Sequence, residues 1–140
     1  MFTHSESDLG VGDLLVRYGA IRPDQFEEAL ELATRWQVSI SDVLMSRWWL
    51  RAEVYSRAVA AYHGLRFVRM RDEPADAELL NPEDIDFYLQ NLIIPWGTVN
   101  GRVQLATTSP GPKTLLTARA KWGSSLFHVG SVSSTPPAMR

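Results

Sequence analysis

The chain lacks cysteine, and none of its 140 residues lies in a long apolar run. Without cysteine, disulfide bonds and thiol chemistry are excluded, a composition that fits a cytosolic protein. A membrane helix needs about 20 consecutive apolar residues, and no segment supplies them. The polar N-terminus, MFTHSESD, also lacks the charged-then-apolar pattern of a signal peptide. We therefore expect a cytoplasmic protein.

The chain also lacks a strong charge of one sign. Residues 1–65 carry six Arg against nine Asp or Glu, a net charge of −3. Residues 66–140 carry eight Lys or Arg against seven Asp or Glu, a net charge of +1. Neither half has the basic surface that binds nucleic acid, so we expect no nucleic-acid partner. The length suits one domain or two small subdomains.

Patterns of catalytic or metal-binding residues are scarce. No Ser-His-Asp arrangement and no pair of catalytic carboxylates stands out, so we expect no enzyme activity in these residues. The D-x-D spacing of Asp84 and Asp86 falls in the first turn of an expected helix, where carboxylates interact favourably with the helix dipole. Since the three histidines are scattered and cysteine is absent, we also expect no metal site.

What the sequence does contain is a diverged internal repeat. Residues 11–33 align without gaps on residues 40–62, an offset of 29 positions. Identical residues occupy four aligned pairs: Asp13/Asp42, Leu15/Leu44, Arg22/Arg51 and Ala29/Ala58. Apolar residues occupy six more: Val11/Ile40, Leu14/Val43, Val16/Met45, Ile21/Leu50, Phe26/Tyr55 and Leu30/Val59. The repeat predicts one helical hairpin built twice, because a single unit cannot bury its apolar face alone.

Local signals give the expected helices of this repeat. The apolar spacing predicts a first helix that starts near Val11, with Gly19 as its C-cap. Pro23 suits the first turn of the next helix. In the second unit, Ser39 can cap a helix, and residues 63–64, His-Gly, indicate the end of the last one. We assign residues 1–8 to a disordered N-terminus and residues 9–64 to a duplicated helical subdomain.

The remaining sequence has a different character. Alternating or β-rich segments predict strands at residues 65–70, 93–99, 102–108 and 126–132. Helices are predicted from the Asn81-Pro82 start to about residue 91, and over residues 112–122. The order β-α-β-β-α-β implies a small sandwich with helices on one face of a mainly antiparallel sheet. We therefore expect an α+β fold, with an α+β subdomain at residues 65–132 and a linker or tail at 133–140.

The repeat carries a family resemblance. Residues 11–21, VGDLLVRYGAI, resemble the motif L-G-x-x-L-φ-x-x-G-x-φ, and residues 34–38 match the five-residue spacer between two such motifs. The chain resembles the N-terminal, MshEN-like domain of type II secretion and type IV pilus assembly ATPases, which also occurs fused to bacterial membrane glycosyltransferases. The resemblance covers about residues 9–132. It implies a cytosolic module at the inner face of the bacterial inner membrane, in contact with the membrane only through a larger assembly.

The resemblance also implies a ligand, cyclic di-GMP, bound in that family by an Arg and a Gln from each motif. Here the Arg positions hold Gly10 and Ser39, and the Gln positions hold Ala33 and Tyr62. We therefore expect no cofactor, and a diverged sensor of cyclic di-GMP or another nucleotide is kept as the alternative. Its candidate residues are Val11, Gly12, Arg17, Gly19, Ile40 and Arg47.

Tryptophan and arginine provide the other candidate site. Trp48 stands where the family has a helix-ending Gly that often needs positive φ, so we expect the local turn to be rebuilt. Trp and Arg are enriched at the hot spots of protein interfaces. The alternative is that one of the two adjacent tryptophans is core and the other half-covers it. The candidate partner-binding residues are Trp36, Arg47, Trp48, Trp49 and Arg51.

These observations lead to one functional hypothesis. We expect a non-catalytic regulatory or docking module that acts through protein–protein contacts, either with a protein partner or with the enzyme to which it is fused. The larger machine would be a membrane glycosyltransferase or a secretion or pilus ATPase.

Overall fold

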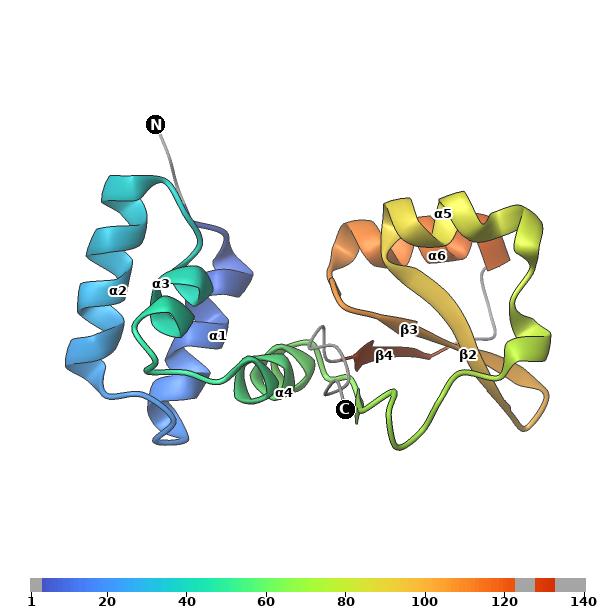
Figure 1. The fold of residues 1–140 in the computed structure, drawn as a ribbon, viewed down its shortest axis with the longest axis horizontal. Coiled ribbons are helices and arrows are strands. Elements are labelled where there is room, and N and C mark those ends of the chain that lie inside the picture. The colour runs from blue at the N-terminus through green and yellow to red at the C-terminus, as the bar shows by residue number, and fades with distance from the viewer. Residues whose placement is uncertain (1–3, 123–127, 133–140) are drawn as a thin grey trace, which may run out of the picture.

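The computed structural model describes residues 4–122 and 128–132 (Figure 1). The predicted disorder of residues 1–3, the start of the last strand at residue 126, and the tail at 133–140 lie outside these residues. Four helices come first, followed by a β-α-β-β-α-β order, so the predicted α+β fold with a duplicated helical hairpin is confirmed. The helices are α1 (Glu6–Arg17), α2 (Pro23–Trp36), α3 (Ile40–Ser46), α4 (Ala52–Tyr62), α5 (Ile85–Asn91) and α6 (Pro112–Trp122). The strands are β1 (Phe67–Val68), β2 (Ile93–Val99), β3 (Arg102–Thr107) and β4 (Val129–Val132), with 3-10 turns at Ala77–Leu79 and Pro82–Asp84.

The first helix is longer than the sequence predicted. It begins at Glu6 rather than near Val11, so residues 6–8, assigned above to a disordered N-terminus, are helical. Ser5 is the N-cap, and its side-chain oxygen accepts a hydrogen bond from the backbone N–H of Asp8 at 3.1 Å. Glu6 and Asp8 add negative charge at the positive end of the helix dipole. These local polar contacts extend the helix beyond its apolar stripe.

The two repeat units pack by exchanging helices. α1 lies chiefly against α4, and α2 lies chiefly against α3, so each unit is completed by the other. The aligned apolar pairs form one core, as the repeat predicts. Its buried members include both residues of four aligned pairs: Val11/Ile40, Leu15/Leu44, Ile21/Leu50 and Ala29/Ala58.

The second half is built on one four-stranded sheet with the order β1-β4-β3-β2. β2 and β3 pair antiparallel, with Asn100 (φ 53°) and Gly101 (φ 76°) in the turn, as the Asn-Gly signal predicts. β4 pairs parallel with both β3 and β1, so the prediction of a mainly antiparallel sheet is wrong for β1 and β4. The physical reason is the connection, because a helical crossover such as α6 returns the chain parallel to the strand before it.

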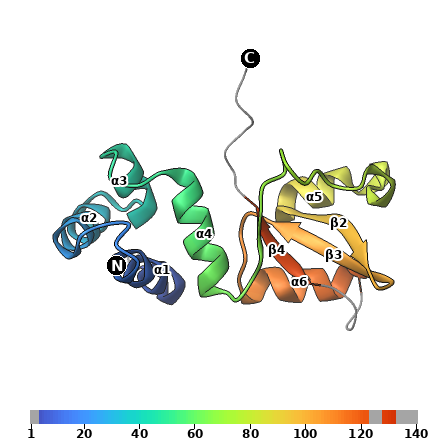
Figure 2. The same ribbon diagram turned by 90° about the horizontal axis from the view of Figure 1, so that it is seen from below.

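Helices α5 and α6 cover one side of the sheet, and α4 joins the sheet to the repeat. α5 and α6 lie on the same side of the sheet (Figure 1), and Ile93, Leu105 and Ala118 form the buried core beneath them. α4 contacts β1 and β4, so the last helix of the repeat is also the support of the sheet (Figure 2). Among the described residues, no helix combines the length and the hydropathy that crossing a membrane requires.

Candidate functional site

The turns that end the first helix of each repeat unit have the same backbone geometry. After α1, the Gly19 N–H donates to the carbonyl of Val16 at 3.0 Å, and the Ala20 N–H donates to that of Leu15 at 2.9 Å. After α3, the Trp48 N–H donates to the carbonyl of Met45 at 3.0 Å. The N–H of the residue after it donates to the carbonyl of Leu44 at 3.0 Å. Both turns are Schellman motifs, with the residue after the C-cap in the left-handed region.

Trp48 therefore occupies a glycine position without any change in the turn. Its φ is 60°, where Gly19 has 74°, so the prediction of a rebuilt turn is wrong. A residue with a Cβ in this conformation costs roughly 1–2 kcal/mol relative to a right-handed one. The Trp48 side chain is 94% exposed, so packing within the described residues does not offset that cost.

The neighbouring tryptophan has an ordinary structural role. Trp49 is half-buried and packs against the core of the repeat. The guanidinium carbon of Arg47 lies 5.7 Å from the centroid of the Trp49 ring, within the range of a cation–π contact. One tryptophan is thus attached to the core, as the alternative reading supposed, but the other projects into solvent.

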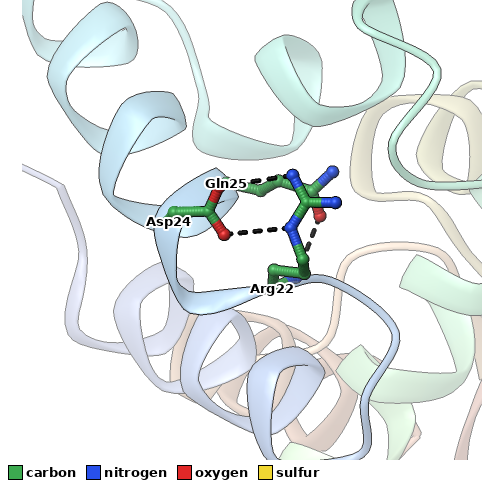
Figure 3. A network of polar contacts seen from close by, with 3 residues as sticks. All are labelled: Arg22, Asp24 and Gln25. Carbon is green, nitrogen blue, oxygen red and sulfur yellow. Dashed lines mark hydrogen bonds and ion pairs between the residues drawn. The ribbon is translucent and has the colours of Figure 1, made fainter.

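The remaining partner-binding candidates lie at helix ends. Trp36 is the last residue of α2 and is 54% exposed, and Arg51 is the exposed N-cap residue of α4. In the first unit, the residue aligned with Arg51 is Arg22, whose Nε donates to Asp24 Oδ1 at 3.0 Å (Figure 3). This contact lowers the pKa of the Asp24 carboxyl, chiefly by hydrogen bonding, and raises the pKa of the Arg22 guanidinium.

The second unit uses the corresponding carboxylate differently. Glu53 is aligned with Asp24, and its Oε1 lies 2.7 Å from Nε of Arg69, a residue of the segment that leads into the second half. Arg51 forms no ion pair with another residue of the described ranges, although Arg22 does. The guanidinium of Arg51 is therefore available next in sequence to the Trp48 turn.

The nucleotide-binding candidates fall into separate places. Val11, Gly12 and Ile40 line one cavity between the repeat units, but its volume of about 10 Å³ suits roughly one water molecule. Arg17 is on the exposed face of α1, where its Nη2 lies 2.6 Å from Asp13 Oδ2. Arg47 lies over the Trp49 ring, and Gly19 lies in the turn after α1.

The positions that hold Arg and Gln in the resembled family have packing roles here. A Cβ on Gly10 would lie 2.1 Å from Cε1 of Tyr62. Gly10, at the first Arg position, therefore packs directly against Tyr62, at the second Gln position. Ser39, at the second Arg position, caps α3 through the N–H of Asp42 at 3.1 Å. Ala33, at the first Gln position, is completely buried. All four positions therefore serve the contacts between helices or the helix ends.

The structure also contains cavities that the sequence does not predict, and one of them lies between the two halves. A space of about 210 Å³ lies between α1, α4 and the loop after β3, and Tyr55, His63 and Thr108 are among its lining residues. Burial raises the pKa of the Tyr55 hydroxyl and lowers the pKa of the His63 imidazole. This cavity joins residues that are far apart in the chain, and no local pattern signals such a contact.

Comparison with known proteins shows what the chain resembles. Residues 63–124, which are 62 of the 140 residues, match the MshEN domain family. The match begins at the residue after α4 and covers most of the second half, and it leaves α1, α2, α3 and α4 outside. No curated protein matches the chain.

Solved structures show the same fold over almost the whole chain. A structure of MshE with cdg has a TM-score of 0.74 at 18% identity, covering 87% of this chain and 88% of that chain. A structure of the N-terminal domain of XpsE has a TM-score of 0.63 at 15% identity, covering 94% and 90%. A second crystal form of the XpsE N-terminal domain has a TM-score of 0.51 at 17% identity, covering 95% of this chain and 92% of that chain. The chain thus combines an MshEN match in its second half with the fold of the MshE and XpsE domains.

Proposed function

We propose that this chain is a non-catalytic, cytoplasmic regulatory and docking module in a larger bacterial machine. The fold of the MshE and XpsE domains and the MshEN match support a secretion or pilus ATPase as that machine. A membrane glycosyltransferase is the second candidate machine, on the resemblance noted in the sequence. The module acts by binding another protein or another domain of its own machine.

The observation that carries this proposal is the exposed side chain of Trp48. Glycine is the favoured residue at this turn, and the tryptophan ring is 94% exposed. Strained residues in native structures are typical of functional sites. Because the fold gains nothing from the ring, we infer that it serves a contact outside the chain.

The surroundings define the chemistry of the partner. Trp and Arg dominate interface hot spots, and Arg47 and Arg51 flank the two tryptophans in the sequence. A partner that fits has an apolar pocket for the indole of Trp48 and carboxylates at its rim for the guanidinium groups. Arg51 can meet such a carboxylate, because its guanidinium forms no ion pair with another residue of the described ranges.

The test measures binding of the chain to the catalytic domain of the candidate ATPase or glycosyltransferase by isothermal titration calorimetry. Trp48→Gly should weaken the complex at least tenfold, which corresponds to about 1.4 kcal/mol. Because glycine suits the turn, the variant keeps its fold, and circular dichroism verifies this. Tyr18→Ala is the matched control, since Tyr18 is 69% exposed beside the equivalent turn of the first unit. Equal affinities for wild type and Trp48→Gly would reject the docking role.

A nucleotide sensor is the second proposal, favoured by one observation: the similar MshE structure contains cdg. If cdg is cyclic di-GMP, binding here has to use residues other than the four packed ones, and Arg17 and Arg47 are the candidates. Titration of the chain with cyclic di-GMP should give no heat up to about 1 mM if docking is its function, since phosphates need nearby cations or N–H donors. Micromolar binding that is lost in Arg17→Ala or Arg47→Ala would establish the sensor instead.

A further inference from the structure

The charges of the second half are sorted onto two different segments. All seven carboxylate side chains of residues 66–140 lie between residues 72 and 86: Asp72, Glu73, Asp76, Glu78, Glu83, Asp84 and Asp86. No Lys or Arg lies in that segment. α6, by contrast, carries Lys113, Arg119 and Lys121 and contains no acidic residue. The start of α5 is therefore acidic and α6 is basic.

Both helices also expose large apolar side chains. On α5 and at its C-cap, Ile85 is 51% exposed, Leu89 is 69% exposed and Leu92 is 50% exposed. Their spacing of i, i+4 and i+7 places them on one face of the helix. On α6, Leu116 is 66% exposed. An exposed apolar stripe beside charged residues is typical of an interaction surface.

The C-cap of α5 adds a backbone observation. Leu92 is held at a φ of 54°, in the left-handed region, and half of its side chain is exposed. This is the same combination as at Trp48, a large exposed apolar residue in a costly conformation. The apolar stripe of α5 thus ends on a strained residue.

The two helices run in opposite directions on one side of the sheet (Figures 1 and 2). Nζ of Lys121 lies 2.9 Å from Oδ1 of Asp84, and the rings of Phe87 and Trp122 meet edge to face at 5.7 Å between centroids. The acidic start of α5 therefore lies beside the basic end of α6. Leu89 of α5 and Leu116 of α6 are the most exposed large apolar side chains of the two helices, at 69% and 66%.

We propose that this face is a homodimer interface in which α5 of each copy lies on α6 of the other. A two-fold axis parallel to the helices produces this arrangement, and the surface is then complementary to itself, as a two-fold interface requires. It puts the acidic start of α5 opposite the basic end of α6 of the second copy. Leu89 and Leu116 of the two copies cover each other at the centre.

Several charged side chains of this helix pair form no ion pair within one chain, so they are available to a second copy. Glu83 and Asp86 form no ion pair with another residue of ranges 4–122 and 128–132, and the same holds for Lys113 and Arg119. Within one chain the pair Asp84–Lys121 already joins the two helices. Attraction between exposed charges is screened by salt, so the dimer should weaken as ionic strength rises.

The experiment measures the mass of the 140-residue chain by sedimentation equilibrium from about 1 µM to 1 mM, a range that covers weak and strong dimers. Wild type should move from 15.7 kDa toward twice that mass. Leu89→Asp should raise the dissociation constant at least tenfold, because it buries a carboxylate in the apolar centre. Tyr18→Asp is the matched control, with the same 69% exposure on the other half, and should dimerise like wild type.

Charge reversal tests the pairing of α5 with α6. Asp86→Lys should weaken the dimer, and Arg119→Glu should do the same, because Arg119 lies in the last turns of α6. The two substitutions combined should restore it, because the acidic and the basic residue are then exchanged. Circular dichroism checks that each variant is folded. A wild type that stays at 15.7 kDa at every concentration, a dimer indifferent to Leu89→Asp, or a combined variant no better than its parents would each overturn the proposal.

Discussion

The two units of the helical repeat have the same core and the same turns, but they place different residues at them. Aligned apolar residues are buried in both units. Gly12 and Gly19 of the first unit correspond to Ser41 and Trp48 of the second, yet the turn at Trp48 has the backbone of the turn at Gly19. The two turns therefore keep one backbone geometry. We infer that the residue type at each turn depends on contacts outside its repeat unit.

The difference also assigns separate tasks to the units. The first unit satisfies its charges locally, as in the Arg22–Asp24 pair. The second unit uses Glu53 to hold Arg69 of the following segment, and its last helix contacts the sheet. The second unit is thus the connector, and Trp48 is the most exposed large apolar residue of the part that the structure describes.

The largest effect is expected from exchanging residues at the Gly12 and Ser41 positions. Gly12→Ser should lower the free energy of unfolding by roughly 1–3 kcal/mol, because overpacking displaces neighbouring side chains. The Cβ would lie 2.4 Å from Cε1 of Phe26. Ser41→Gly should cost less, about 0.5–1 kcal/mol for glycine in a helix. Urea unfolding followed by circular dichroism measures both values.

A smaller partner ring should relieve the first of these effects. Phe26→Leu combined with Gly12→Ser should recover part of the loss, since the contact at Gly12 involves the ring atoms of Phe26. Additive costs in the double variant would show that the ring is not the obstacle. Equal costs for Gly12→Ser and Ser41→Gly would contradict the claim that the two units differ here.

The helix starts offer a second comparison. Ser39 caps α3, but the aligned Gly10 lies inside α1, which is capped earlier by Ser5. Ser39→Ala and Ser5→Ala should each lower the free energy of unfolding by about 1 kcal/mol, the usual value of a lost N-cap. Gly10 cannot replace Ser5 as the cap, because it lies inside the helix and has no side chain that could accept a hydrogen bond. A cost near zero for Ser5→Ala, measured by urea unfolding, would show that the extension of α1 adds no stability.

Periodicity and turn residues predicted most of the fold. The repeat gave the helices and their core, and Asn100-Gly101 gave the hairpin of β2 and β3. The parallel pairing of β4 with β1 could not be predicted, because that contact joins segments far apart in the chain. The start of α1 was missed because capping by Ser5, rather than apolar spacing, sets it.

The candidate site was only partly predictable. The sequence showed that Trp48 is unusual at a glycine position. It could not show whether the turn would change or whether Trp48 would adopt a positive φ, because both outcomes are compatible with the same residues. The packing of Gly10 against Tyr62 needs the two units to exchange helices, which the alignment of the units does not reveal. Side-chain partners such as Arg69 for Glu53 likewise depend on tertiary contacts.

The turns themselves give a third prediction, with the opposite sign in the two units. Trp48→Gly should raise the free energy of unfolding by about 0.5–1 kcal/mol, because glycine removes the strain of a positive φ and the exposed ring loses no packing. Gly19→Trp should lower it by a similar amount, since φ there is 74° and open space surrounds the residue. Thermal unfolding of the two variants beside wild type measures both changes. A destabilised Trp48→Gly variant would mean that the ring does contribute to the fold.

The smallest effect is expected at His63, whose counterpart in the first unit is Thr34, a residue that does not titrate. Burial lowers the pKa of His63 in the folded chain below its usual value of about 6.5. The folded state therefore binds the proton less well than the unfolded state. The chain should lose stability as the pH falls from about 6.5 through the lower folded-state pKa.

His63→Gln removes this titration and keeps a polar side chain beside the cavity. Urea midpoints at pH 7 and pH 5 should therefore fall less in the variant than in wild type. The carboxylates and the other histidines are present in both proteins. Their contribution therefore cancels when the fall in urea midpoint of the variant is subtracted from that of wild type. An equal fall in both proteins would show that His63 is protonated as easily in the fold as in the unfolded chain. Its position at the end of the connector helix would then be open to water rather than desolvated by the contact between the two halves.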